Sequence, residues 1–295
     1  LVAGESPVEV AVRQQPDDAP GRSRLSIEVR RRGGEPGDDA IAEARRTLEN
    51  MLGLGVDLAG FYDLACSDGR LDQLARRFCG VRPPRFASAF EALVNAVACQ
   101  QLSLTVGIHL LDRLAAVYGP TVALRAAPPG FPTPERLAGA EPAHLRGLGF
   151  SLAKARTLTL LARKVAAGAF DLDGLEDLDD EQAFATLVSL PGIGRWSAEY
   201  VLLRGLGRLH VLPGDDVGAR NNLRRRFDLA ADAGYDDLAA LAGRWWPYGG
   251  LVYFHLLLDG LAGAGHLSAE GGLPAAKTGA DLVSEGSDDQ SGEVA

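Results

Sequence analysis

Residues 190–207 read LPGIGRWSAEYVLLRGLG, a short glycine-containing turn followed by a helical pattern. Residues 179–190 before it also have helical periodicity, so the turn joins two helices. Gly192 and Gly194 permit a tight reversal with backbone angles that other residues avoid, and they leave backbone amides open to a ligand. Those amides begin the next helix, whose dipole favours an anion such as a phosphate. An ordinary turn with a glycine cap is the alternative interpretation of PGIG alone.

The regions around this hairpin predict a mainly α fold. Apolar residues recur at helical spacing from residue 38 to about residue 261, and Ser88 is placed to cap one of these helices. Within residues 1–37, the runs 8–12 and 25–29 alternate apolar and polar residues, as strands do. We therefore expect three parts: a small, truncated N-terminal β-containing segment (1–37), a helical domain (38–263) with a hairpin at 179–207, and a disordered acidic tail (264–295).

Composition excludes several classes of protein. The 295 residues are 46% hydrophobic and 23% charged, as in soluble globular proteins. Three widely spaced cysteines make neither a disulfide framework nor a CxxC zinc site, and they favour a reducing cytoplasm. No apolar stretch is long enough to span a bilayer, so no membrane partner is expected.

The net charge of −9 argues against a DNA-binding surface that covers the whole protein, but the acids are concentrated. Residues 171–183 carry seven acidic residues and no basic one, and residues 264–295 carry six acidic residues and one lysine. The rest of the chain is net basic by three charges. We expect these acidic segments to lie away from any DNA-binding face. The basic residues are 27 arginines and only three lysines, Lys154, Lys164 and Lys277.

Four segments together carry a resemblance to a known family. They are LPGIG (190–194), LPGDD (212–216), RPPRFASAFEALVNAVACQQLS (82–103) and RWWPY (244–248). With them, most of residues 40–263 resembles the helix-hairpin-helix DNA glycosylases, in particular the DNA-3-methyladenine glycosylase II (AlkA-like) branch. The resemblance implies two helical subdomains that flank a cleft. It also implies a monofunctional enzyme that flips alkylated purines of the 3-methyladenine type out of duplex DNA and excises them by hydrolysis in base excision repair.

The resemblance assigns the catalytic role to Asp216. A carboxylate can stabilise the positive charge that develops on the sugar, or it can orient the attacking water. The alternative is that the Asp215-Asp216 pair caps the following helix, and both roles can apply to one pair. Bifunctional relatives carry a nucleophilic lysine at the second position after LPGxG, where this chain has Trp196. Because no lysine lies in the hairpin or the loop, a Schiff-base route is disfavoured.

The resemblance also assigns residues to the base pocket and to the wedge that fills the gap in the duplex. The pocket residues are Trp196, Tyr200, Tyr248 and Gln100, and the wedge is Gln101 with Leu102 beside it. Aromatic rings attract a cationic alkylated base. Core packing is the more common fate of aromatics at helical spacing, and a polar turn is the alternative for 99–103. Val217 and Tyr248 depart from the family pattern, which puts the lesion range in doubt.

The remaining expectations concern phosphates, ions and assembly. The residues expected to bind DNA phosphates are Gly192, Gly194, Arg195 and Arg220, with a solvated helix face as the alternative for Arg220. The resemblance allows a monovalent cation at the carbonyls of Leu190 and Ile193, and no other cofactor is expected. The histidines show no metal spacing, and His255 reads as a core residue. We expect a monomer in the cytoplasm, associated with the nucleoid.

Two other functions fit the same residues. A glycosylase of this fold with another damaged-base preference would share the hairpin and an aromatic pocket. A non-catalytic helix-hairpin-helix DNA-binding module would keep the hairpin alone, and the presence of Asp216 argues against it.

Overall fold

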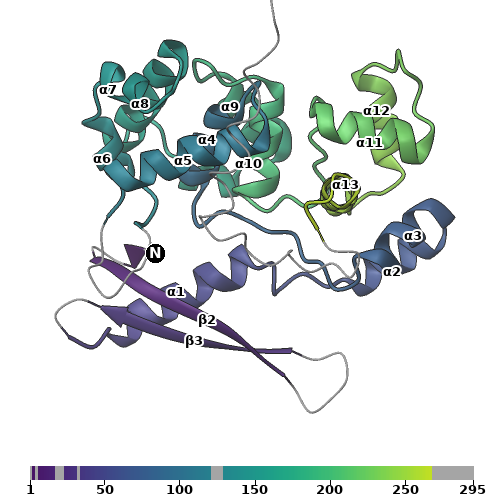
Figure 1. Ribbon diagram of the computed structural model, residues 1–295, viewed down its shortest axis with the longest axis horizontal. Coiled ribbons are helices and arrows are strands. Elements are labelled where there is room, and N and C mark those ends of the chain that lie inside the picture. The colour runs from purple at the N-terminus through teal and green to yellow at the C-terminus, as the bar shows by residue number, and fades with distance from the viewer. Residues whose placement is uncertain (1, 4–5, 17–22, 32–33, 121–128, 268–295) are drawn as a thin grey trace, which may run out of the picture.

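A β-hairpin with one helix lies beneath two groups of helices (Figure 1). The computed structural model describes residues 2–3, 6–16, 23–31, 34–120 and 129–267. Its elements are β1 (Val2–Ala3), β2 (Ser6–Pro16), β3 (Ser23–Arg31), α1 (Asp38–Met51), α2 (Ala59–Cys66), α3 (Gly69–Arg77), α4 (Ala89–Cys99), α5 (Leu104–Tyr118), α6 (Pro134–Ala138), α7 (Pro142–Gly147), α8 (Leu152–Ala166), the 3-10 helix η1 (Asp173–Asp177), α9 (Asp180–Val188), α10 (Arg195–Arg204), α11 (Val217–Phe227), α12 (Tyr235–Gly243) and α13 (Gly249–Gly263).

The sheet is antiparallel in the order β1-β2-β3. The pairing of β2 with β3 brings together the strands predicted from alternating apolar and polar residues. Val10 pairs with Val29 and Val12 with Ile27, so the branched residues share one face. Helix α1 lies against this sheet (Figure 1) and buries Ala44 and Leu48. The helical region that begins at residue 38 therefore contributes its first helix to the β-containing part rather than to the helix groups.

The first group of helices, which we call the hairpin lobe, comprises α4 to α10. Its core is mostly aliphatic, with Phe90 and Phe150 also buried, and Leu93, Leu158 and Val201 from three of its helices are fully buried in it. The α9–α10 hairpin packs on this core through Leu190 and Ile193. Leu190 and Ile193 thus anchor the turn in the core, while Gly192 and Gly194 are exposed at the surface.

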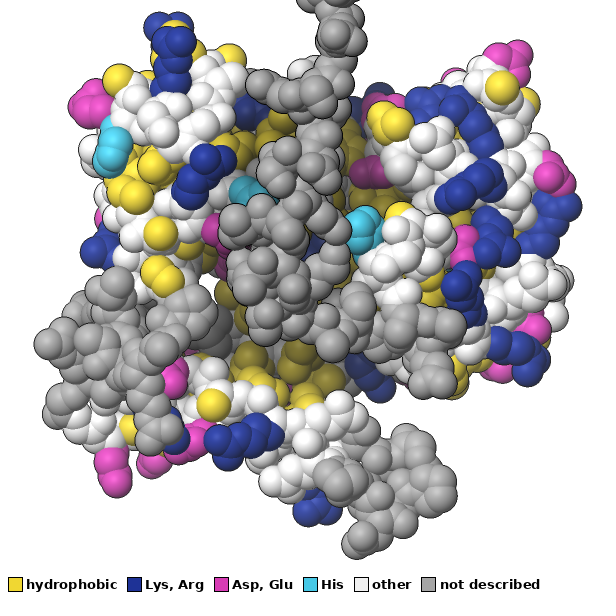
Figure 2. All heavy atoms as spheres, viewed as in Figure 1, with side chains coloured by type: hydrophobic (Ala, Val, Ile, Leu, Met, Phe, Trp, Pro, Cys, Tyr) yellow, Lys and Arg dark blue, Asp and Glu magenta, His cyan; other side chains and the backbone are white. Residues whose placement is uncertain are grey.

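The second group, the arginine lobe, joins α2 and α3 to α11, α12 and α13. Its core contains Phe61, Leu223 and Tyr253, which come from parts of the chain more than 150 residues apart. Lys and Arg side chains gather on this lobe (Figure 2). Two of its arginines, Arg77 and Arg226, bind the buried carboxylate of Asp259 and tie α3 and α11 to α13.

Helix starts follow the predicted capping chemistry. Ser88, Ser103 and Ser151 each accept a backbone amide of the helix that follows, and Asp179 forms a capping box with Gln182. The predicted mainly α fold with two helical subdomains is confirmed. In the part of the chain that is described, no helix combines the length and apolarity needed to cross a membrane. The expected acidic tail falls, from residue 268 onward, outside the described residues.

His255 is a core histidine, as the sequence analysis expects. It is 1% exposed, lies 4.9 Å from the ring of Phe61 and contacts the carbonyl of Leu251 through Nδ1. Its Nε2 has no hydrogen-bond partner among the described residues. Burial therefore lowers the pKa of His255 below its ordinary value, because the apolar core disfavours the charged ring.

This burial predicts a pH-dependent stability. Below the ordinary histidine value of 6.5, the unfolded chain takes up a proton that folded His255 resists, so the free energy of unfolding falls with falling pH. The loss between about pH 7.5 and about pH 5.5 should be smaller in His255→Leu than in wild type. Urea titrations at both pH values measure it. His266→Leu, at an exposed position, is the control, and equal losses in all three proteins would contradict the assignment.

Candidate active site

A cavity of about 830 Å³ lies where the two lobes meet. The hairpin lobe contributes the turn after α4, the start of α8 and the start of α10, and the arginine lobe contributes the start of α11. Its volume suits a flipped nucleotide or a ligand of similar size. The lining residues are Cys99, Gln100, Gln101, Leu102, Ser151, Ala153, Lys154, Gly194, Arg195, Trp196, Ser197, Asp215, Asp216, Val217 and Gly218.

The two hairpin glycines have different roles. Gly192 has φ +81°, and a Cβ there would meet the side chain of Thr157 at 2.7 Å, so glycine is required. Gly194 has φ −98°, which any residue adopts, and a Cβ there would meet nothing within 4 Å. The expectation that both glycines need special angles is therefore wrong for Gly194. The start of α10 has no side-chain cap, so its first amides remain open to an anion.

The turn after α4 is held on the hairpin. The Gln100 amide nitrogen donates to the Gly192 carbonyl and to the Ser197 hydroxyl, both at 2.9 Å. Gln101 follows with φ +55°, a left-handed conformation that is rare for a residue with a side chain. Leu102 is 40% exposed beside it. The structure thus presents Gln101 and Leu102, the two predicted wedge residues, on a fixed, strained turn at the rim of the cavity.

Asp216 uses both carboxylate oxygens. Oδ1 accepts the Ala219 amide at 2.7 Å and so caps α11. Oδ2 accepts the indole N–H of Trp196 and the hydroxyl of Tyr253, each at 3.2 Å. The same residue therefore caps the helix and faces the cavity, whereas the neighbouring Asp215 lies 3.7 Å from Arg220.

The predicted aromatic residues separate into two places. Trp196 lines the cavity, and the Tyr200 ring lies 5.2 Å from it at 30°. The Tyr200 hydroxyl donates to Asn95 at 3.0 Å, and burial raises the pKa of Tyr200 to about 12. Tyr248 is not brought to the cavity. Its hydroxyl packs against Gly60, and its ring lies 5.9 Å from Phe61, because the chain before α13 turns toward α2.

Two residues at the site are absent from the sequence-based assignment. Tyr253 reaches Asp216 from an apolar helix whose pattern indicates only core packing. Glu199, 4% exposed, accepts the Gly214 amide at 3.1 Å and the Tyr235 hydroxyl at 2.5 Å. Burial raises the pKa of Glu199, and these two donors act against that rise. Glu199 lies on α10, so these bonds hold the loop that carries Asp216 against that helix.

Lys154 corrects an expectation. Although it lies on α8, far from the hairpin in sequence, it lines the same cavity as Asp216. Its ammonium donates to the carbonyls of Ala98 at 2.9 Å and Gln100 at 2.6 Å. Burial lowers the pKa of Lys154. The absence of lysine from the hairpin and loop sequences therefore does not by itself keep an amine away from the site.

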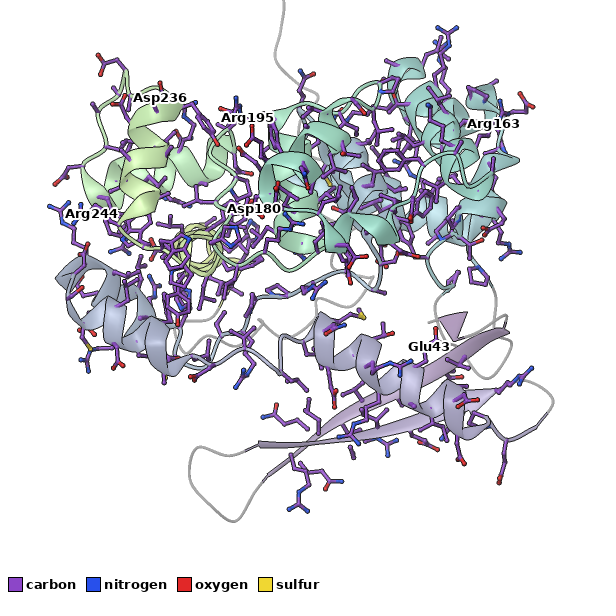
Figure 3. All side chains as sticks on the ribbon, turned by 180° about the vertical axis from the view of Figure 1, so that it is seen from behind. Glu43, Arg163, Asp180, Arg195, Asp236 and Arg244 are labelled. Carbon is purple, nitrogen blue, oxygen red and sulfur yellow. The ribbon has the colours of Figure 1, made fainter. Side chains whose placement is uncertain are left out.

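The two candidate phosphate-binding arginines, Arg195 and Arg220, make different contacts. Arg195 is half-exposed, stacks 4.2 Å above the Tyr235 ring and lies at the upper rim between the lobes (Figure 3). Arg220 donates to the Ala233 carbonyl at 2.6 Å, which favours the structural interpretation for it. In the acidic segment, Asp180 is paired with Arg208 and His210 and lies below Arg195 in the same view (Figure 3).

The hairpin geometry predicts a contrast between two alanine variants. Gly192→Ala should lower the free energy of unfolding by about 2 kcal/mol, because the left-handed backbone and the Thr157 contact both oppose a Cβ. Gly194→Ala should change it by less than about 0.5 kcal/mol, since its angles and space are ordinary. Equilibrium unfolding measures both. Equal effects of the two substitutions would contradict the geometry described above.

The family model and the sequence relatives that match this chain indicate the same family. Residues 94–248 match the family model described as HhH-GPD superfamily base excision DNA repair protein. DNA-3-methyladenine glycosylase 2 of Escherichia coli is 32% identical over 226 residues, which cover 72% of this chain and 77% of that protein. DNA-3-methyladenine glycosylase of Bacillus subtilis is 27% identical over 215 residues, which cover 72% and 71%.

Solved structures agree with the sequence relatives. The 3-methyladenine DNA glycosylase from Archaeoglobus fulgidus superposes with a TM-score of 0.74 and 28% identity, covering 85% of this chain and 82% of that one. The Schizosaccharomyces pombe 3-methyladenine DNA glycosylase, solved with abasic DNA, has a TM-score of 0.57 and 26% identity, covering 65% and 92%. The chain with the hairpin, the loop and the cavity described here belongs to the HhH-GPD superfamily of base excision DNA repair proteins.

Proposed function

We propose that the protein is a monofunctional DNA glycosylase that flips alkylated purines of the 3-methyladenine type out of duplex DNA and releases them by hydrolysis. The observation that carries this proposal is the Asp216 carboxylate, fixed beside Trp196 in a cavity that Gln101 also lines. The names of the relatives support the same substrate class.

The chemistry follows from the position of the carboxylate. When the N-glycosidic bond breaks, the base leaves with the bonding electrons and the sugar becomes positively charged. A base already methylated at a ring nitrogen carries a positive charge, so it leaves without a further proton. Asp216 stabilises the sugar cation, and water then adds to the anomeric carbon and loses a proton to solvent. Three donors fix both carboxylate oxygens of Asp216, so the carboxylate is held in place for this electrostatic role.

Recognition of the base falls to the cavity wall. The Trp196 ring, backed by Tyr200, offers an electron-rich face to a cationic purine. Gln101 and Leu102 are placed to enter the duplex where the nucleotide leaves. Gln100 has its amide nitrogen on the hairpin, so only its carbonyl oxygen is left for a base.

The DNA backbone is expected at the upper rim between the lobes. There the open amides at the start of α10 and the Arg195 side chain favour a phosphate. A monovalent cation at the Leu190 and Ile193 carbonyls stays a prediction; the Leu190 carbonyl also accepts the Ile193 amide at 3.1 Å. No other cofactor takes part in this scheme. The proposed enzyme acts as a monomer on double-stranded DNA in the cytoplasm, associated with the nucleoid.

The function is tested by base release from defined duplexes. Wild type should release 3-methyladenine from methylated DNA faster than it releases deaminated or oxidised bases from single-lesion duplexes. Chromatography of the free bases measures both. Release of only deaminated or oxidised bases would favour the alternative glycosylase, and no release with DNA binding intact would favour a binding module.

Asp216→Asn should lower the single-turnover rate at least about 100-fold, because it removes the charge and keeps a capping oxygen. Affinity for duplex DNA should remain within about threefold of wild type. Asp215→Asn is the matched control, since Asp215 is the partly exposed neighbour paired with Arg220. Near-normal turnover by Asp216→Asn would remove Asp216 from the catalytic role.

Monofunctional chemistry gives a separate prediction for Lys154. Two carbonyls hold the Lys154 nitrogen on the turn after α4, so the amine is engaged there and is not presented to the sugar, although burial lowers the pKa of Lys154. Borohydride, which traps a Schiff base, should leave wild type uncrosslinked to a lesion duplex during turnover. A trapped complex that disappears in Lys154→Met would instead establish a lyase activity.

A further inference from the structure

We propose that Tyr253 is a positioning residue that orients the Asp216 carboxylate for the reaction. This inference rests on the proposed function, because it gives Tyr253 a role only if Asp216 is the catalytic carboxylate.

The contact joins two different helices of the arginine lobe. Tyr253 lies one turn into α13, and its hydroxyl donates to Asp216 Oδ2 at 3.2 Å, at the start of α11. The Trp196 indole donates to the same oxygen from α10. Asp216 Oδ1 is held separately by the Ala219 amide. Donors from three elements therefore hold the carboxylate, and its plane cannot rotate without breaking one of these bonds.

Tyr253 does not take part in lining the cavity. It is 2% exposed and belongs to the core of the arginine lobe, whereas Trp196 and Asp216 both face the cavity. A flipped base can displace or reorient Trp196, which is part of the cavity wall. Tyr253 is shielded from DNA, so its hydrogen bond can persist throughout the reaction. This difference makes Tyr253 the more constant of the two donors to Oδ2.

The surroundings of Tyr253 suit its hydroxyl to donate a hydrogen bond and disfavour its ionisation. Burial raises the pKa of Tyr253 well above its ordinary value, and the adjacent Asp216 carboxylate raises it further. The charged or titratable groups that influence it are Asp216, Tyr200 and Arg204. The Arg204 guanidinium acts in the opposite direction to the other two. The hydroxyl therefore keeps its proton and remains a hydrogen-bond donor to Asp216 Oδ2.

A purely structural role makes a different prediction. If the Tyr253 hydroxyl only satisfied a buried polar group, its removal would lower thermal stability and leave the chemistry unchanged. If it orients the catalytic carboxylate, its removal lowers the rate of base release and weakens the binding of a cationic sugar mimic relative to a neutral one. The ring can be retained in both cases, because Tyr253→Phe deletes only the hydroxyl.

The experiment measures single-turnover release of 3-methyladenine by wild type, Tyr253→Phe and Tyr118→Phe. It also measures their affinities for duplexes that hold a cationic pyrrolidine or its neutral tetrahydrofuran counterpart at the target sugar. Tyr118→Phe is the matched control, because its hydroxyl bonds His144 in the hairpin lobe at 2.7 Å, away from Asp216. We expect Tyr253→Phe to be about tenfold slower at neutral pH, with unchanged affinity for the neutral duplex. Its preference for the cationic duplex should fall below that of wild type, since one of the donors that orient the carboxylate is lost. Tyr118→Phe should match wild type in all three properties.

Each other outcome identifies what fails. A wild-type rate in Tyr253→Phe would overturn the inference, and so would a lower rate with the wild-type preference for the pyrrolidine duplex. Thermal unfolding of each variant establishes that a slow protein is still folded at the assay temperature. Asp216→Asn in the same series separates the two claims. If it is inactive while Tyr253→Phe is normal, only the role of Tyr253 fails, and if it remains active, the proposed function of Asp216 fails first.

Discussion

The hydrogen bonds to the Asp216 carboxylate hold the elements of the site together. It begins α11 by accepting the Ala219 amide, and it joins α10 and α13 by accepting Trp196 and Tyr253. A helix cap holds the backbone of the loop, and the two side-chain donors set the direction of the second oxygen. Helix capping and the proposed chemistry therefore use the same side chain, and a neutral replacement can preserve the first while it removes the second.

The surrounding contacts extend this arrangement to the DNA-binding elements. Glu199 on α10 accepts a hydrogen bond from the Gly214 amide, which holds the loop against that helix. Gln100 donates to the Gly192 carbonyl, which holds the turn after α4 against the hairpin. Lys154 closes the other side of that turn through the Ala98 and Gln100 carbonyls. The turn of Gln101, the hairpin and the loop that carries Asp216 are thus linked by hydrogen bonds to α8 and α10. Such preorganisation keeps the carboxylate in place before the charged sugar forms.

Local sequence signals predict the helical region, the Ser88 cap and the hairpin turn, because each depends on neighbouring residues, whereas the family resemblance assigns Asp216. Tyr253, Glu199 and Lys154 could not be found this way. Each reaches the site from a helix whose own pattern shows only packing or solvation, and only the tertiary arrangement brings them together. Tyr248 shows the converse error: alignment with the RWWPY segment placed it in the pocket, whereas its ring packs beside Phe61. Gly194 was misjudged because a glycine letter does not reveal its φ angle.

The central claim is that Asp216 acts through its charge on a cationic sugar. It is tested most directly by the affinity of the protein for duplexes in which the target deoxyribose is replaced by a cationic pyrrolidine or by its neutral tetrahydrofuran counterpart. Because transition-state mimics bind more tightly than neutral analogues, wild type should prefer the pyrrolidine duplex by about 100-fold or more. Asp216→Asn should lose that preference while it keeps its affinity for the neutral duplex. Equal affinity of wild type for the two duplexes, or a preference that survives in Asp216→Asn, would contradict the account.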